Sequence, residues 1–167
     1  MSANRERPHV VVLPEDDADR QIANGFHIEI GSLRTMRVLP PARGWRKAVS
    51  RFKEYHAAQM EACTNRFLIL LIDFDGREDR FLEVRREIPA GLADRVFIVG
   101  TWTEPERLRT DLGAAYEAIG RKLAKDCRED TDATWNHPLL RHNAAELARL
   151  RERVRPILFQ PPAAAFA

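Results

Sequence analysis

Runs of consecutive apolar residues alternate along the chain with stretches in which apolar residues recur every three or four positions. The valines of HVVVLP, residues 9–14, predict a strand, and the longer run RFLILLID, residues 66–73, predicts a strand that is buried on both faces. TMRVLPP, residues 35–41, indicates a short strand closed by two prolines, and RVFIVGT, residues 95–101, indicates another apolar strand. The pattern therefore predicts four strands.

The segments between these runs have the spacing of helices. Asp16 or Asp17 can cap a helix that begins near Ala18. After the second strand, an amphipathic helix is indicated by Trp45, Val49, Phe52, Tyr55 or His56, and Met60. We expect helices over residues 18–26, 44–63, 77–88, 104–127 with a break near Gly113, and 136–159.

Strands that alternate with helices predict an α/β fold with a mostly parallel, four-stranded central sheet flanked by helices, followed by C-terminal helices. We expect one domain over residues 1–160. Its core covers about residues 9–109, and a helical C-terminal part covers residues 110–160. Residues 161–167, PPAAAFA, are expected to form a loose tail.

Composition adds little about partners. The chain has 167 residues, 44% hydrophobic and 31% charged, which is typical of a globular protein, and its net charge of +2 is too small to indicate a nucleic-acid partner. The C-terminal arginines form either a solvated helix face or a phosphate-contacting one: Arg141, Arg149, Arg151, Arg153 and Arg155.

Two features bear on the compartment. Cys63 and Cys127 have no metal-ligand spacing, which suggests a reducing interior. The sequence contains no apolar run long enough to cross a membrane and no signal-peptide pattern at its N-terminus. We expect a cytoplasmic protein with no membrane partner.

Acidic residues follow the ends of the predicted strands, where sites lie in parallel sheets. Glu15 follows the first strand, with Asp19 one helical turn further on, and Glu104 follows the last strand. Alternation along the third strand should place Asp73 and Asp75 on one side, where two like charges call for a cation. Such residues also cap loops and complement helix dipoles without any ligand. A cluster of carboxylates without His or Cys suits Mg²⁺ or Mn²⁺, which in proteins typically act on phosphate esters.

VVVLPEDDAD followed by FLILLIDFDGRED resembles a Toprim domain, the metal-binding fold of topoisomerases, primases and overcoming-lysogenization-defect nucleases. The family has a Glu after its first strand, matched by Glu15, and an Asp-x-Asp after its third, matched by Asp73 and Asp75. In the nuclease branch an acidic residue stands four positions after the Glu, matched by Asp19, and a further one matches Glu104.

The resemblance, which covers about residues 9–109, implies a Toprim or Rossmann-like fold and a Mg²⁺- or Mn²⁺-dependent endonuclease acting on DNA or RNA. Glu15 would act as metal ligand or general acid/base, and Asp73 and Asp75 would bind metal. Tyr55 and Tyr116 both fall in amphipathic helices, so hydrolysis by water is expected in place of strand transfer through a tyrosine.

Basic residues would have to hold the nucleic acid. Arg77 and Arg80 follow the carboxylates directly, and Lys122 and Lys125 lie on the helix after the last strand. In TWNHP, Trp135 and its neighbour His137 either pack in the core or cover one side of the site. The chain has no phosphate-binding Gly-rich loop, so the resemblance implies a separate ATPase partner, in anti-phage defence or DNA repair.

Three alternatives remain open. DFDG also resembles the motif of haloacid-dehalogenase phosphatases, in which the first Asp is the nucleophile. A response-regulator receiver would use an acidic pocket and a threonine, for which Glu15, Asp16, Asp73 and Thr101 are candidates. The third is a Toprim-like binding or regulatory subunit without catalytic activity. Stability measured with and without Mg²⁺ distinguishes a metal site from a structural acidic edge.

Overall fold

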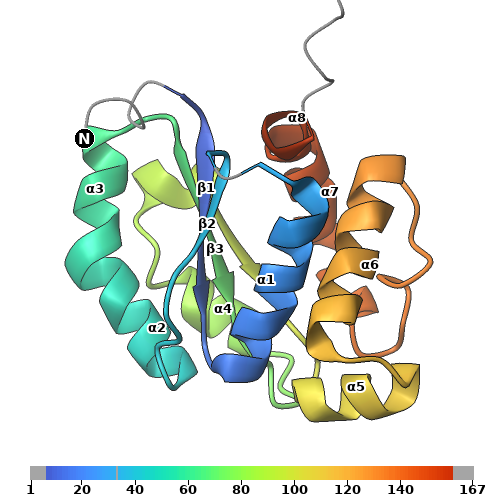
Figure 1. Cartoon of the computed structure of the whole chain (residues 1–167). Coiled ribbons are helices and arrows are strands. Elements are labelled where there is room, and N and C mark those ends of the chain that lie inside the picture. The colour runs from blue at the N-terminus through green and yellow to red at the C-terminus, as the bar shows by residue number, and fades with distance from the viewer. Residues whose placement is uncertain (1–6, 33, 160–167) are drawn as a thin grey trace, which may run out of the picture.

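Four parallel strands form the centre of the structure, a computed structural model that describes residues 7–32 and 34–159 (Figure 1). The strands are hydrogen-bonded in the order β2-β1-β3-β4, and each neighbouring pair is parallel. The predicted mostly parallel, four-stranded α/β sheet flanked by helices is therefore confirmed. The strands are β1 (His9–Pro14), β2 (Met36–Val38), β3 (Arg66–Leu71) and β4 (Val96–Val99).

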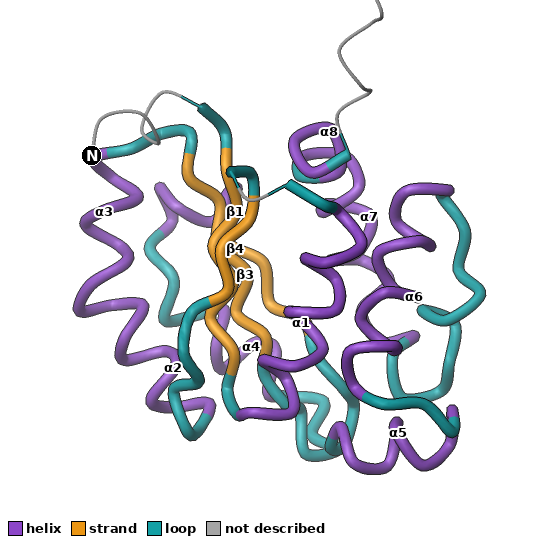
Figure 2. Tube along the Cα trace, viewed as in Figure 1, coloured by secondary structure: helices purple, strands orange, loops and turns teal. Residues whose placement is uncertain are grey.

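Helices cover both faces of this sheet (Figure 2). The helix expected over residues 18–26 runs on to Ile30, and Gly31 in the left-handed conformation (φ 75°) ends it. The break expected near Gly113 is present, because that glycine (φ 58°) ends one helix before the next begins. In chain order the helices are α1 (Asp17–Ile30), α2 (Trp45–Arg51), the π-helix η2 (Phe52–His56), α3 (Ala57–Ala62), α4 (Arg80–Arg85), the 3₁₀-helix η3 (Ala90–Arg95), α5 (Pro105–Leu112), α6 (Tyr116–Glu129), the 3₁₀-helix η4 (Arg141–Asn143), α7 (Ala144–Arg153) and α8 (Arg155–Leu158).

Alternate residues of β1 pack into two separate apolar layers, which is why the whole strand is apolar. Val10 and Val12 belong to the layer between the sheet and helices α1, α6, α7 and α8. Val11 and Leu13 belong to the layer beneath α2, α3 and α4. Both layers are built from residues less than a tenth exposed, so the sheet is buried from both sides.

The chain changes from one face of the sheet to the other between β1 and β3. α1 leads from β1 to β2 across one face, whereas α2, α3 and α4 lie on the other face and lead on to β3 and β4. Strand connections that run in opposite directions leave a crevice at the carboxyl ends of the two central strands, the topological switch point of such sheets. Residues that follow β1 and β3 therefore meet in this crevice.

Two glycines bring α1 and α6 into close contact (Figure 1). A Cβ on Gly25 would lie 2.0 Å from the backbone oxygen of Glu117, and a Cβ on Gly120 would lie 1.9 Å from that of Ile22. Any larger residue would push the two helix backbones apart. This contact holds α1, and with it the first residues after β1, firmly against the rest of the fold.

Side chains of the C-terminal part form hydrogen bonds with the backbone groups at the outer edge of β4. The Ile98 amide donates to the Glu146 carboxylate at 2.8 Å. The Asn143 side chain accepts from the Gly100 amide at 3.2 Å and donates to the Gly100 carbonyl at 2.9 Å. Both side chains are buried, so the residues after position 140 are part of the sheet's support.

Two of the expectations concern parts of the chain beyond the sheet. The loose tail expected over residues 161–167 lies outside the described residues. Across residues 7–32 and 34–159, no helix combines the length and the apolar character needed to cross a membrane.

Candidate metal centre

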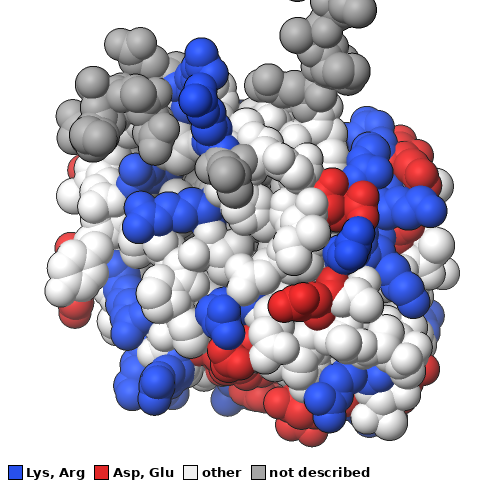
Figure 3. All heavy atoms as spheres, viewed as in Figure 1, with Lys and Arg blue, Asp and Glu red and all other residues white. Residues whose placement is uncertain are grey.

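Three carboxylates meet in the crevice at the switch point. Glu15 follows β1, Asp19 lies in the first turn of α1, and Asp73 follows β3. One oxygen from each lies within 4.8 Å of the other two. In Figure 3 acidic side chains gather at the lower centre of the molecule, at the carboxyl ends of the strands. We call Glu15, Asp19 and Asp73 the acidic triad.

Backbone hydrogen bonds hold Glu15 in place. Its amide donates to the Leu71 carbonyl at 2.8 Å, which extends the β1–β3 ladder by one residue. Its carbonyl accepts from the amides of Arg43 (2.6 Å) and Gly44 (3.2 Å) in the loop before α2. One side-chain oxygen, Oε2, accepts from the Asp73 amide at 2.7 Å, so the two acidic residues are joined directly.

The start of α1 positions Asp19. Asp16 is the N-cap residue, and its side chain accepts from the Asp19 amide at 2.9 Å. This cap turns the chain into the helix directly after Glu15, so the next turn brings Asp19 back over the carboxyl end of β1. The spacing of four between Glu15 and Asp19 is therefore explained by a strand that passes into a capped helix.

Asp19 is buried, and no cation of the described chain forms an ion pair with it. Its exposed fraction is 1%, and neither side-chain oxygen has a hydrogen-bond partner within the described chain. Burial holds the pKa of Asp19 well above its usual value, and the negative charges of Asp73 and Asp16 raise it further. An ionised carboxylate in such a position is costly unless a cation or a donor accompanies it.

Asp73 shares this environment. It is 6% exposed, and the Thr101 hydroxyl donates to its Oδ1 at 3.4 Å. Burial raises the pKa of Asp73 to about 8, and the charges of Glu15 and Asp16 add to the effect. Burial also raises the pKa of Glu15, although the hydrogen bond from the Asp73 amide opposes it. The three carboxylates therefore cannot all ionise at neutral pH unless a cation joins them, and the triad could hold a metal ion.

Asp75 is not a member of the triad, but its charge lies near enough to raise the pKa of Glu15 and of Asp73. The ladder between β3 and β4 continues beyond Leu71, since the Phe74 amide donates to the Thr101 carbonyl at 3.0 Å, and the chain turns only at Asp75. Asp75 has a positive φ of 52° and is followed by Gly76 at 68°, which turns the chain away. Its side chain is 55% exposed and pairs with Arg80 at 2.9 Å.

Glu104, the other predicted ligand, is also outside the triad. It is exposed and occupies the N-cap position of α5 without a side-chain capping bond. β4 is the edge strand, one position further from β1 than β3 is, so the residue after it lies to the side of the crevice.

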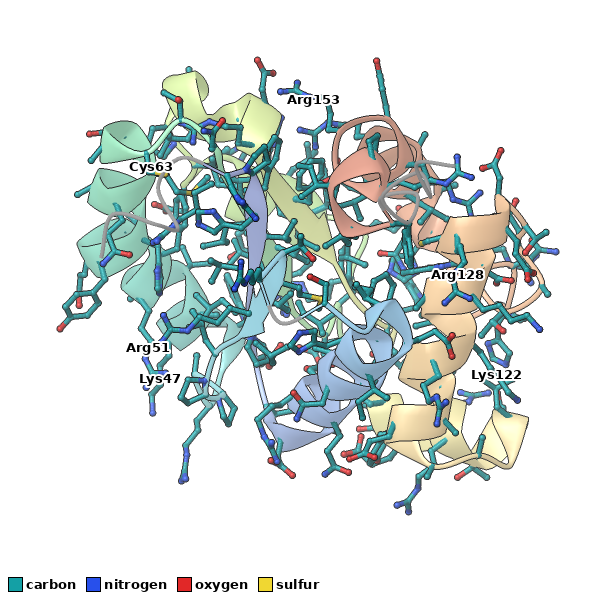
Figure 4. The ribbon with its side chains drawn as sticks, turned by 45° about the horizontal axis from the view of Figure 1, so that its top comes forward. Lys47, Arg51, Cys63, Lys122, Arg128 and Arg153 are labelled. Atoms are coloured by element: carbon teal, nitrogen blue, oxygen red, sulfur yellow. The ribbon has the colours of Figure 1, made fainter. Side chains whose placement is uncertain are left out.

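The predicted basic residues have different surroundings. Arg80 is 4% exposed and donates to the Asp73 carbonyl at 3.1 Å, with its guanidinium 4.3 Å from the ring centre of Trp45. Arg80 therefore forms part of the wall of the site. Arg77 is exposed and paired with Asp79 at 2.8 Å. Lys122 projects outward from α6 (Figure 4), and Lys125 is also exposed, on the side of α6 that does not pack on α1.

Trp135 and His137 do not cover the site, and the packing alternative is confirmed for Trp135. Its ring is buried, and its Nε1 donates to the Leu123 carbonyl at 3.1 Å. His137 lies 3.5 Å from Asp111 and accepts from the Leu139 amide at 3.1 Å.

Two residues near the triad were not predicted as members of a metal site. Thr101, named above only for a receiver-like pocket, bonds Asp73 because β3 and β4 are neighbours. Trp45 stacks on Arg80 although 35 positions separate them in the chain, and only its apolar helical spacing is visible in the sequence.

Comparisons with known proteins add no family to this geometry. No protein-family model matches the chain, and searches of curated proteins and of solved structures find no match either. The resemblance to Toprim domains stays a prediction. The established features are a doubly wound parallel sheet and an acidic triad at its switch point.

Proposed function

We propose that this protein is a Mg²⁺- or Mn²⁺-dependent phosphodiesterase that cleaves nucleic acid, of the type found in Toprim nucleases. The observation that carries the proposal is Asp19, which is buried in a group of three carboxylates and whose oxygens accept no hydrogen bond from an amide, hydroxyl or cationic group of the described residues. In the described chain no Lys or Arg forms an ion pair with any member of the triad. Oxygen ligands alone suit hard divalent cations, and Mg²⁺ and Mn²⁺ are the common choices.

The residues of the triad have distinct parts in such a reaction. A bound cation would supply a Lewis acid for the phosphate oxygens and a water of lowered pKa. Asp19 and Asp73 would hold it through their buried oxygens. Glu15 is half-buried and uses only Oε2 in its bond to the Asp73 amide, so Oε1 is left to accept a proton from the attacking water. The raised pKa of Glu15 suits that transfer.

Exposed cations in the loop before α2 and on α2 support an anionic substrate. Arg43, whose amide bonds the Glu15 carbonyl, has an exposed side chain, and Arg46 and Lys47 are exposed at the start of α2. Lys47 and Arg51 project into solvent on the same side of the molecule (Figure 4). Phosphates of a nucleic acid could contact these groups while one phosphodiester reaches the triad.

The test is cleavage of single- and double-stranded DNA and RNA with Mg²⁺ or Mn²⁺. We expect wild-type protein to cut at least one substrate and Glu15→Gln, Asp19→Asn and Asp73→Asn to lose activity. Asp17→Asn is the matched control, since Asp17 is an exposed acid in the same helical turn and pairs with Arg20. Equal activity in all variants would overturn the assignment of the triad.

An ATPase partner is proposed on the resemblance alone. Cleavage that appears only when an ATPase from the same cell is added would support it, and full activity of the isolated chain would refute it. Co-purification from the native host is the direct measurement.

A receiver-like phosphoacceptor role for Asp73 is the second candidate, favoured by the Thr101 hydroxyl that bonds its carboxylate. Incubation with acetyl phosphate and Mg²⁺, followed by intact-protein mass spectrometry, separates the two. A phosphoryl adduct lost in Asp73→Asn would favour the receiver, and an unmodified protein would exclude it.

A further inference from the structure

A second cavity lies at the β2 edge of the sheet, away from the acidic triad. Its volume is ≈ 330 Å³, and it is lined by the first half of β1, by β2, and by residues from α1, η2 and α3. Figure 1 looks onto this edge, with β2 in front. The titratable groups that line the cavity are all basic: Arg34, Arg37, Arg66, His9, His27 and His56. We call it the basic cavity.

The arginines of the basic cavity have no acidic partners in the described chain. The side chains of Arg34 and Arg37 form neither an ion pair nor a hydrogen bond there. Within the described chain Arg66 donates to two neutral groups, the Nε2 of His9 at 3.0 Å and the Oε1 of Gln59 at 2.5 Å. No carboxylate of the described residues therefore offsets these charges, and Figure 3 shows Lys and Arg side chains over this part of the surface.

The three histidines of the cavity differ in their hydrogen bonds. His9 accepts from Arg66 through Nε2 and donates through Nδ1 to the Arg7 carbonyl at 2.9 Å. His27 donates to the Ser32 carbonyl at 2.9 Å. His56 has a buried Nδ1 without a hydrogen-bond partner in the described chain. Burial lowers the pKa of His56, and so do the charges of Arg66, Arg37 and Arg51.

We propose that the basic cavity binds a phosphate group, carried either by a nucleotide or by the backbone of a nucleic acid. Guanidinium groups form charge-assisted, bidentate hydrogen bonds with phosphate, and three arginines that have no acidic partner in the described chain match its several oxygens. The cavity is within the usual range for small-ligand sites, and Met36, Val38 and Leu39 supply apolar walls for a sugar or base. His56 Nδ1 supplies a further polar contact.

This inference is independent of the function proposed for the triad. The six residues of β1, at about 3.3 Å each, place the two sites about 15–20 Å apart. A short single strand could therefore reach both, whereas a mononucleotide would occupy the basic cavity alone.

Histidine ring resonances provide the assay, recorded in EDTA so that the triad holds no metal. The probes are inorganic phosphate, adenosine monophosphate and a short oligodeoxynucleotide, titrated into ¹⁵N-labelled full-length protein. The chain has five histidines, and His137 and His142 are internal references because neither lines the cavity. We expect the rings of His9, His27 and His56 to shift and the two references to stay unchanged.

Charge-matched variants complete the test. Arg34→Gln with Arg37→Gln should raise the Kd for each probe about tenfold or more. Arg86→Gln with Arg107→Gln removes the same charge from exposed sites elsewhere and should leave the Kd unchanged. Both double variants should keep the wild-type Tm, since none of the four side chains is buried.

Comparable Kd values for the nucleotide and the oligonucleotide would identify a free nucleotide as the ligand. An oligonucleotide bound about tenfold more tightly would identify a nucleic-acid strand. The proposal is overturned if no probe shifts the three cavity histidines, or if the two double variants bind equally well. Because all measurements are metal-free, an inactive triad would not alter these results.

Discussion

Replacing Asp73 by Asn should stabilise the metal-free protein at pH 8, although Asp73 is central to the proposed chemistry. The native state raises the pKa of this carboxyl from 3.8 to about 8, chiefly through burial. Because the native state holds the proton more tightly than the unfolded state, stability falls as pH rises between those two values. A shift of this size corresponds to about 6 kcal/mol at most. Asn keeps the oxygen that accepts from Thr101 and carries no charge.

Relaxation and water entry reduce such penalties, so we expect a gain of about 2 kcal/mol at pH 8, or about 4–8 °C in Tm. Near pH 4 the gain should be small, because the carboxyl is then protonated in the native state and close to half protonated in the unfolded state. The assay is urea denaturation followed by circular dichroism from pH 4 to 8.5 in EDTA. Asp17→Asn serves as the control, since hydrogen bonds from Arg20 and Gln21 lower the pKa of Asp17 and its removal should not stabilise the protein.

Two results would refute this reasoning. One is an Asp73→Asn variant whose stability has the same dependence on pH as the wild type. The other is a variant less stable than the wild type at pH 8, which would mean that the carboxylate is already compensated in the native state. Either result would remove the main physical argument for a cation at the triad.

Three further predictions concern metal binding and packing. Mg²⁺ or Mn²⁺ at about 100 times its Kd should stabilise the wild type by about 2.7 kcal/mol in a thermal-shift assay. The same metal concentration should stabilise Asp19→Asn far less. Equal stabilisation of both proteins would mean that the metal binds elsewhere. Gly120→Ala should destabilise the protein by about 1–3 kcal/mol, because the new Cβ would meet the backbone of α1. Gly91→Ala should be nearly neutral, since a Cβ at that position would have no atom within 4 Å. Urea denaturation of the two variants measures the difference. Asn143→Ala should lower the free energy of unfolding by about 2–3 kcal/mol, because it leaves the Gly100 amide and carbonyl unpaired. Asn136→Ala, at an exposed position, should leave the free energy of unfolding unchanged. Similar losses in both variants would contradict the role of the Asn143 side-chain hydrogen bonds.

Local patterns were sufficient to predict the sheet. Valine-rich runs and helical spacing each report on residues close together in the chain, so the four strands and their α/β arrangement could be read from them. The same applies to Glu15 and Asp19, because a capped helix that begins directly after a strand fixes their relation within five residues. Asp73 joins them because β3 is the neighbour of β1.

The conformation of Asp75 has a local cause that spacing does not reveal. The backbone hydrogen bonds to the neighbouring strand continue as far as Phe74, and the chain turns at Asp75. The positive φ of Asp75 then turns its side chain toward Arg80. An Asp-Gly pair after a strand is a turn signal, and this pair marks the turn.

Other features depend on contacts between distant segments. Arg80 looked like a surface cation, but Trp45 and the carbonyl of Asp73 enclose it. The basic cavity collects residues from five parts of the chain, between His9 and Arg66, that show no common motif. Only the three-dimensional arrangement brings them together.

The side chains that bond the outer edge of β4 also bear on how far the chain can be shortened. An unpaired edge strand offers a row of amides and carbonyls to any other strand, and proteins normally block such edges. Here Glu146 and Asn143 occupy the amides of Ile98 and Gly100. A fragment that ends near residue 140 would keep all four strands and the triad but would expose that edge, so we expect it to self-associate through β4. The last helices thus act as protection against aggregation, and a minimal version of this protein must retain them.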